Sequence, residues 1–210
     1  MTIIFKYIYL IVKIMLGVSL AFPTIFTGVS FINVITNLDE YKTRLKLVRK
    51  ITPQIIWNVF LLSPIIFEIL FKNFPIYVIK KSIYEESHEF VMSLILIECV
   101  FYINHFTFHK IAWLYKNFHK KHHEIKNVLG IGAIYCSSIE HVFINLFPFL
   151  LSHIIYSNSA LHCILMMLLG LSNTILKSHT DKKGSHSRHH LNFNTDYGVF
   201  GVLDYVCGTS

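Results

Sequence analysis

The sequence predicts an all-α fold, a polytopic membrane helix bundle with a histidine-rich cap on its cytoplasmic side. Hydrophobic residues make up 53% of the 210 residues, and the mean hydropathy of +0.52 is too high for an ordinary soluble domain. The apolar residues gather in five stretches, and histidines gather in three clusters that lie outside them. Apolar stretches of this kind are expected to be helices, because lipid cannot satisfy the backbone groups of an open strand or loop.

The five apolar stretches are interpreted as the spans of one membrane domain that covers residues 1–210. Each is near the ~20 residues that a helix needs to cross a bilayer. They lie within residues 7–36 and at about 53–71, 90–103, 139–157 and 160–176. Lys13 and Pro23 interrupt the first stretch, and Ser157 to Ser159 predict a tight turn between the last two. The N-terminus lacks a convincing cleavage site, so we expect the first stretch to be retained in the membrane.

Lysine and arginine predict how the bundle is oriented. The segment 37–52 is rich in cations, and under the positive-inside rule it faces the cytoplasm. Its cations are Lys42, Arg44, Lys46, Arg49 and Lys50. Alternating the spans from there places segment 72–89 on the far side and segments 110–138 and 177–210 on the cytoplasmic side. The net charge of +7 therefore indicates cytoplasmic loops rather than a surface that binds nucleic acid.

Three tight histidine clusters carry the strongest chemical signal. They read His105-x-x-x-His109, His119-x-x-His122-His123 and His186-x-x-His189-His190, within residues 105–123 and 186–190. Because residues i, i+3 and i+4 share one face of a helix, each cluster presents its imidazoles together. Imidazole suits iron, copper, nickel and zinc, and these eight ligands exceed the about four that one zinc site takes. The clusters predict two metal ions held close together, with His179 as a candidate ninth ligand.

Two carboxylates in the apolar stretches are candidates for holding the second nitrogen of a metal-bound imidazole. Glu98 lies seven residues before His105 and therefore on the same face of a helix. Glu140 opens the fourth stretch. An acidic group inside a membrane helix is costly and usually functional. The alternative for either carboxylate is that it snorkels to the membrane surface or makes a polar contact between helices.

The remaining histidines and the cysteines are expected to be structural. The isolated histidines are His88, His141, His153 and His162. The four cysteines are scattered and form no C-x-x-C pair, which argues against a disulfide framework or a thiolate metal site. For the clusters themselves, the alternative is a solvated basic surface that meets anionic lipid. Three clusters on one side of the membrane make that alternative the weaker one.

The clusters and their surroundings resemble the sterol desaturase and fatty acid hydroxylase superfamily of membrane di-iron oxygenases, over about residues 98–210. The family's first motif is an acid, an aromatic pair and H-x-x-x-H, and here it reads Glu98, Phe101-Tyr102, His105 and His109. The second motif, His119-Lys-Lys-His122-His123-Glu124, fits closely. Within the superfamily, Gly130 to Tyr135 followed by Glu140 is similar to the 4-methylsterol oxidase branch. Ser178-His179 resembles a family position after the last span, and Asn194 to Gly198, Asp204 and Gly208-Thr209 resemble the closing signature.

The chain also departs from the family pattern in three places. Phe106 stands where the family usually has arginine. Ser137 and Ser138 stand where the 4-methylsterol oxidase branch usually has histidine and proline. The tract between His179 and the third cluster is much shorter than in the family.

The resemblance implies that two iron ions activate dioxygen to oxidise an unactivated C–H bond of a membrane lipid. The branch implies a methylsterol monooxygenase-like enzyme that oxidises the 4-methyl group of a sterol in sterol biosynthesis. The resemblance also implies that the protein is located in the endoplasmic reticulum membrane. Electrons are expected from cytochrome b5 and an NAD(P)H-dependent reductase, because no G-x-G-x-x-G or P-loop motif occurs in the chain. Two alternatives are a sterol desaturase or fatty acid or sphingolipid hydroxylase on the same scaffold, and an inactive metal-binding membrane protein descended from the family.

Overall fold

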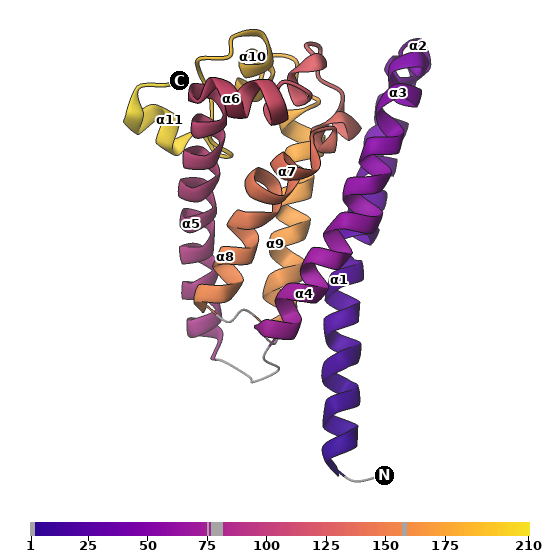
Figure 1. Cartoon of the computed structure of the whole chain (residues 1–210), viewed down its shortest axis with the longest axis vertical. Coiled ribbons are helices and arrows are strands. Elements are labelled where there is room, and N and C mark those ends of the chain that lie inside the picture. Colours follow the sequence, from indigo (N-terminus) through magenta and orange to yellow (C-terminus); the bar gives the residue numbers. More distant parts are fainter. Residues whose placement is uncertain (1–2, 75, 77–81, 157–158) are drawn as a thin grey trace.

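The computed structural model describes residues 3–74, 76, 82–156 and 159–210, with helix side chains from Leu16 onward. The described residues are mostly helical and contain no strand, as the sequence predicts (Figure 1). Five helical runs are long and apolar enough to cross a membrane. They form an all-α bundle in which the second half of the chain carries most of the short helices at one end.

The five runs follow the predicted spans, and some of them are continuous through irregular turns. They comprise α1 (Ile3–Thr36), α3 (Leu45–Ile56) with η1 (Trp57–Leu62) and α4 (Ser63–Asn73), α5 (Ile83–Lys110), α7 (Ser138–Glu140) with η5 (His141–Leu146) and α8 (Phe147–Tyr156), and α9 (Ala160–Ser172) with η6 (Asn173–Ser178). Three of them contain a π-helical turn, at η1, η5 and η6. Such turns occur often at functional sites, and η5 and η6 both reach the site described below.

Some boundaries differ from those expected. Helix α5 begins at Ile83, before the predicted start at Phe90, because Ser82 and Glu85 form a capping box that satisfies the free N–H groups of its first turn. Helix α1 continues through Pro23. Part of the predicted outer segment 72–89 and part of the predicted turn at 157–159 lie outside the described residues. Ser159 itself caps α9, since its hydroxyl accepts from the backbone N–H of His162.

The spans pack in a fixed order. Helix α1 lies against α4 and α9, and α5 lies against α8. The core between them is apolar and includes Phe22, Phe67, Leu146, Met167 and Ile175. Apolar side chains on the outer faces, such as those of Phe31 and Leu161, are about two-thirds exposed at 65% and 66%. An apolar exterior of this kind is expected of helices that lie in lipid.

Short helices cover one end of the bundle and form what is called here the cap. They are α6 (Ala112–Leu114), η2 (Tyr115–His119), η3 (His122–Glu124), η4 (Gly130–Ile134), α10 (Ser185–Leu191) and α11 (Val202–Cys207). Helix α2 (Leu38–Thr43) lies at the same end of the molecule, and the N-terminus lies at the opposite end (Figure 1). The last turns of helix α5 reach the cap, and they place the first histidine cluster beside the other two.

A polar contact ties α1 to the cap. The buried Asn33 side chain donates from Nδ2 to the Thr180 hydroxyl at 2.7 Å and accepts from the Tyr41 hydroxyl at 2.5 Å. The Tyr41 oxygen in turn accepts from the backbone N–H of Ile131 in η4. The side chain of Asn33 fills the space that a Cβ atom on Gly130 would need, so the cap segment and α1 approach closely at this point.

Candidate metal centre

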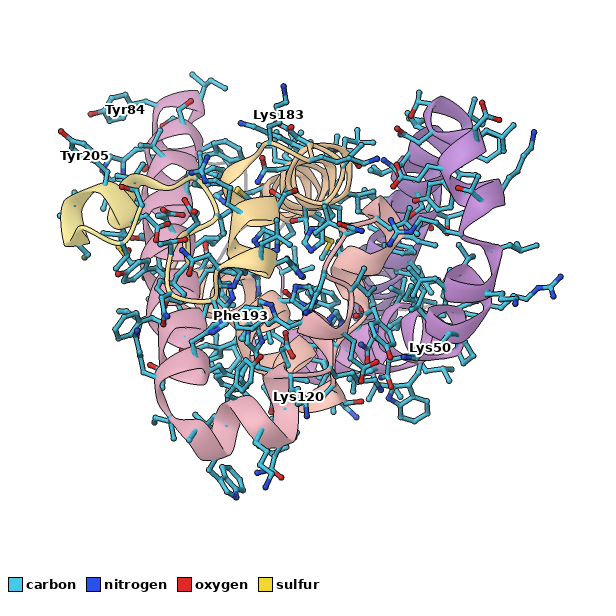
Figure 2. All side chains as sticks on the ribbon, turned by 90° about the horizontal axis from the view of Figure 1, so that it is seen from above. Lys50, Tyr84, Lys120, Lys183, Phe193 and Tyr205 are labelled. Atoms are coloured by element: carbon cyan, nitrogen blue, oxygen red, sulfur yellow. The ribbon has the colours of Figure 1, made fainter. Side chains whose placement is uncertain are left out.

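Nine histidines from five segments come together at the cap end of the bundle, where they form two groups. The first group holds His105, His109, His119, His123 and His189, and the second holds His122, His179, His186 and His190. In each group one ring nitrogen of every member lies within 4.8 Å of the others. All eight histidines of the three clusters, together with His179, therefore converge at one end of the bundle. Figure 2 looks down on this end, where Lys50, Lys120 and Lys183 stand toward the rim.

The spacing of the nitrogens within each group is that of ligands around an ion. In the first group, Nε2 of His119 lies 2.7 Å from Nε2 of His109 and 3.0 Å from Nε2 of His123. In the second group, Nε2 of His186 lies 3.1 Å from that of His179 and 3.2 Å from that of His190. Nitrogens bound at right angles to a metal at about 2.1 Å, the length of a zinc–imidazole bond, would stand about 3.0 Å apart.

Most of these rings are held in place by a hydrogen bond at Nδ1. Five Nδ1 atoms lie within hydrogen-bonding distance of a carbonyl or carboxyl oxygen, and a ring that donates from Nδ1 presents its Nε2 lone pair inward. The acceptors are the Tyr197 carbonyl for His105 at 2.7 Å, the Glu140 carboxylate for His119 at 2.8 Å, the Tyr135 carbonyl for His122 at 3.3 Å, the Thr174 carbonyl for His179 at 3.0 Å and the Thr195 carbonyl for His189 at 2.6 Å. The arrangement sets five Nε2 atoms as acceptors that face the centre of a group.

Burial keeps the rings neutral. It lowers the pKa of His119, His179 and His189 to about 3. The pKa values of His122 and His186 are also lowered, chiefly by burial. Neutral imidazole is the form that binds metal. Nε2 of His189 is buried without a hydrogen-bond partner among the described residues, and a buried lone pair of this kind fits an ion that the donor set would hold.

Glu140 and Glu98, the two predicted carboxylates, have different surroundings. Glu140 is buried and accepts from Nδ1 of His119, as a partner of a metal ligand would. Among the contacts that the structure describes, Glu98 touches backbone rather than imidazole. Its carboxylate accepts from four N–H groups, those of Val199, Phe200, Val202 and Leu203, at 2.9 to 3.4 Å. The helix-face argument placed Glu98 toward the site but did not identify the chain segment that it holds.

Two buried carboxylates, those of Glu98 and Asp204, hold the closing segment 194–209 beside the histidines. Asp204 accepts from the N–H groups of Tyr197 and Gly198, each at 2.7 Å. Together with Glu98 it fixes the loop that offers the Tyr197 carbonyl to His105. A Cβ atom on Gly198 would lie 2.6 Å from the Glu98 carboxylate and 2.9 Å from that of Asp204, which explains why this position carries no side chain.

Sequence reasoning missed several contributors to the site. The Tyr197 ring is fully buried and packs against His105, His109 and His189. The carbonyls of Tyr135, Thr174 and Thr195 hold ring nitrogens, and a carbonyl leaves no mark in a sequence. The signal that the sequence did offer for Tyr197 was its place in the stretch Asn194 to Gly198, which resembles the family's closing signature.

The isolated histidines lie outside both groups. His141 and His153 are buried within the bundle, where their Nε2 atoms contact the Ser63 hydroxyl and the Phe74 carbonyl. His162 is buried at the start of α9, and His88 is exposed on α5. Their positions agree with the structural role expected of them.

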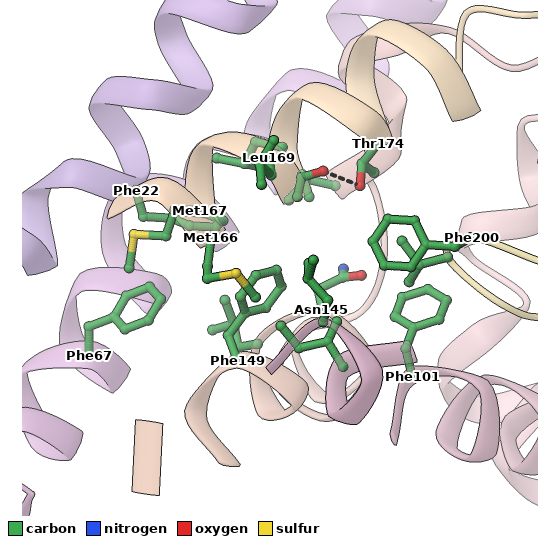
Figure 3. Close-up of a pocket in the computed structure, with 17 residues that line it drawn as sticks. Phe22, Phe67, Phe101, Asn145, Phe149, Met166, Met167, Leu169, Thr174 and Phe200 are labelled. Carbon is green, nitrogen blue, oxygen red and sulfur yellow. Dashed lines mark hydrogen bonds between the residues drawn. The ribbon is translucent and has the colours of Figure 1, made fainter. Parts of the chain in front are cut away.

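An apolar cavity lies among the spans directly below the histidines. Its wall includes Phe22, Phe67, Phe149, Met166 and Met167 (Figure 3). A second, more polar cavity is lined by His105, His119, His122, His179 and His186. Phe101, Asn145, Thr174 and Val199 line both spaces. The apolar cavity is therefore adjacent to the cavity that the metal-ligand histidines line.

Comparisons with known proteins agree with this geometry. The family model for fatty acid hydroxylase matches residues 90–209. Similar proteins include fatty acid hydroxylase domain-containing protein 2 of Macaca fascicularis, 33% identical over 133 residues that make up 58% of this chain and 39% of the relative. Fatty acid hydroxylase ahd1 of Mycosarcoma maydis is 30% identical and is matched over 58% of this chain and 33% of its own length. Human cholesterol 25-hydroxylase is 34% identical over 50 residues, 24% of this chain and 18% of its own.

The match thus spans about two-fifths or less of each of these relatives. No solved structure matches the chain.

Proposed function

The chain belongs to the fatty acid hydroxylase family, and from this premise we propose that it oxidises an unactivated C–H bond of a membrane lipid with dioxygen. The observation that carries the proposal is the apolar cavity that shares four wall residues with a cavity lined by members of both histidine groups. A cavity lined by phenylalanine and methionine excludes water and accepts an apolar chain or ring. Its position among the spans gives a lipid a route from the bilayer to the site.

Two iron ions are the proposed cofactor, one for each histidine group. The five-histidine group and the four-histidine group would each hold one ion through Nε2 atoms, with Glu140 and the loop carbonyls fixing the rings. When bound, iron supplies the activation of dioxygen. The net reaction inserts one oxygen atom into the C–H bond and releases the other as water, and it consumes two electrons and two protons.

The protein's own groups would position the lipid and keep the site dry. The cavity wall holds the apolar body of the substrate, while Phe101 and Val199 narrow its upper end beside the histidines. Electrons come from outside the chain, and cytochrome b5 with an NAD(P)H-dependent reductase is the proposed source. The proposed location is the endoplasmic reticulum membrane, with the cap facing the cytoplasm.

Two lipid classes are proposed as substrate. The stretch from Gly130 to Glu140 resembles the 4-methylsterol oxidase branch and favours the 4-methyl group of a sterol. The names of three relatives instead favour other substrates, a fatty acid for two of them and cholesterol for the third. Both classes fit an apolar cavity, and the resulting products differ in mass and in polar groups.

Lipid profiling combined with metal analysis tests the proposal. Cells that lack the protein should accumulate one lipid class, and cells that express the unmodified chain should convert it to an oxygenated product. His122→Ala should leave protein abundance near normal while product falls to background. Purified protein should contain about two irons per chain and consume dioxygen when reduced. Zinc or no metal, with no oxygen uptake, would instead indicate an inactive descendant of the family.

A further inference from the structure

The apolar cavity and the histidine-lined cavity share four wall residues, Phe101, Asn145, Thr174 and Val199, and this shared boundary is called here the neck. Two of the four are polar, in contrast to the apolar wall below them. Both polar residues stand on π-helical turns, Asn145 on η5 and Thr174 on η6. What a ligand meets at the neck therefore depends on which atoms of these two side chains are free to bond.

The side-chain amide of Asn145 is oriented by the two groups that its nitrogen contacts. Its Nδ2 lies 3.3 Å from Nδ1 of His141 and 3.6 Å from Sγ of Cys136. The Cys136 thiol points to the Ile134 carbonyl at 3.7 Å, so the sulfur is left to accept from the amide. This contact places the NH₂ group of Asn145 away from the neck.

The tautomer of His141 gives the same orientation. The Ser63 hydroxyl donates its single proton to the Asn58 carbonyl at 2.7 Å. The Ser63 oxygen therefore accepts from Nε2–H of His141, which lies 2.8 Å away. The neutral ring then keeps its lone pair on Nδ1, where it accepts from Asn145. The Asn145 carbonyl oxygen faces away from His141, and Figure 3 shows this amide among the cavity-lining residues, beside Phe101 and Phe200.

Thr174 and its neighbour Asn173 supply the other polar atoms. The Thr174 hydroxyl donates to the Gly170 carbonyl at 2.7 Å (Figure 3), so only its lone pairs remain for a ligand. Asn173 lines the histidine-lined cavity, and its Nδ2 is buried without a hydrogen-bond partner among the described residues. A buried donor without a partner is unfavourable, and it indicates a ligand atom that accepts a hydrogen bond.

We infer that the neck binds a hydroxyl group of the lipid substrate. A hydroxyl both donates and accepts, so it can bond to the Asn145 carbonyl or the Thr174 oxygen and also receive the Asn173 amide. An amide N–H only donates and a carboxylate only accepts, so neither satisfies both sides. This inference rests on the proposed function and narrows it, because a hydroxyl held at the neck places a nearby carbon beside the histidines. Asn145 is then a specificity-determining residue, and His141 is a positioning residue that acts through it.

Equilibrium binding without turnover tests the inference apart from catalysis. Two probe pairs are titrated into the full chain in lipid nanodiscs without reductant: a 4-methylsterol with its 3-methyl ether, and a long-chain primary alcohol with its methyl ether. The alcohol of at least one pair should bind about 10-fold more tightly than its ether, the effect of a hydrogen bond near the upper end of the usual range. The pair that shows the preference identifies whether the hydroxyl belongs to a sterol or to an acyl-derived chain.

Substitutions at the neck test the residue assignment. Asn145→Leu should bring the alcohol-to-ether ratio to about one, whereas Asn145→Asp keeps an acceptor oxygen and should keep most of the preference. Met166→Leu, in the apolar wall of the same cavity, should alter both members of a pair alike and preserve the ratio.

Equal binding of alcohol and ether by the unmodified protein in both pairs would overturn the inference, even if the protein oxidises lipids. A preference that persists in Asn145→Leu would overturn the role of Asn145. The proposed function fails separately, if the alcohol is preferred but no lipid is oxidised once iron, reductant and dioxygen are supplied.

Discussion

Single histidines in the two groups should differ in how much metal binding depends on them. The group around His179 has four members, so removal of one leaves three ligands, whereas the group around His123 has five and keeps four. Nδ1 of His179 is also held by the Thr174 carbonyl at 3.0 Å, while Nδ1 of His123 has no partner among the described residues. We therefore regard His179 as a more constrained ligand than His123.

Metal content measured by mass spectrometry on purified protein tests this difference. His179→Ala should lose about one metal ion per chain, whereas His123→Ala should retain both under the same metal supply. His88→Ala, at an exposed position on α5, is the matched control and should leave the content unchanged. Equal retention in His179→Ala and His123→Ala would show that group size does not govern binding.

Glu140 is expected to tune the ligand that it contacts. Its carboxyl group is the only side-chain acceptor among those that hold an Nδ1 atom within the described residues, and it lies 2.8 Å from His119. Glu140→Ala should weaken metal affinity or activity by about 10- to 100-fold, the usual effect of losing such a partner. Glu140→Gln keeps a carbonyl oxygen for the ring and should lose less. Metal titration of both variants checks this order, and identical affinities in Ala and unmodified protein would refute it.

At the scale of an element, the closing segment behaves as a loop fastened by two buried carboxylates. Glu98 reaches it from the middle of α5, and Asp204 reaches it from the start of α11. Glu98→Gln replaces one acceptor oxygen with an amide NH₂, so part of the four N–H contacts is lost. A buried donor left unsatisfied costs about 1–3 kcal/mol, and we expect the loop to open more often.

Hydrogen exchange reports this opening directly. In Glu98→Gln the amides of Val199, Phe200, Val202 and Leu203 should exchange faster, by about 5-fold or more for the cost given above. Amides in α8, which is distant along the chain and packs on another part of α5, should keep their protection. Faster exchange in both places would indicate general destabilisation of the bundle instead of loop release.

The same elements show how far the sequence predicts the structure. The five spans were predictable because length and hydropathy alone define them. The early start of α5 was encoded in Ser82 and Glu85 as an S-x-x-E capping pattern, which the apolar count overlooked. The π-helical turns at η5 and η6 were not predictable, since they depend on packing between spans. The histidines could be grouped by motif, but their division into five and four required the fold.

The contacts that the sequence could not predict are mostly those between residues far apart in the chain. Glu98 was placed on the correct helix face, yet the groups that it bonds are more than 100 residues away. Asn145 has no motif around it, and its orientation depends on Cys136 and His141 nearby in the chain and, through His141, on Ser63 in another span. Hydrogen bonds of this kind are set by tertiary packing, which a single sequence does not display.

For the whole molecule, five spans place the cap and the N-terminus at opposite ends (Figure 1). Cationic residues lie at the cap end, since Lys50 pairs with Glu124 of η3, Lys120 follows η2 and Lys183 precedes α10. The positive-inside rule predicts that this end faces the cytoplasm. A cap in the cytoplasm would let a soluble electron donor approach the histidine groups, while the lipid enters from between the spans.

Cysteine labelling tests that orientation. In a variant from which the native cysteines have been removed, Lys183→Cys should react with a membrane-impermeant maleimide added to the cytoplasmic face of sealed vesicles. Tyr84→Cys lies at the far end of α5 and is 79% exposed, so it should react only after the vesicles are permeabilised. Residues 37–52 and 110–138 should follow Lys183. The opposite pattern would place the cap in the lumen and would exclude cytochrome b5 as donor, because the metal groups would then lie on the wrong side of the membrane from a cytoplasmic reductase.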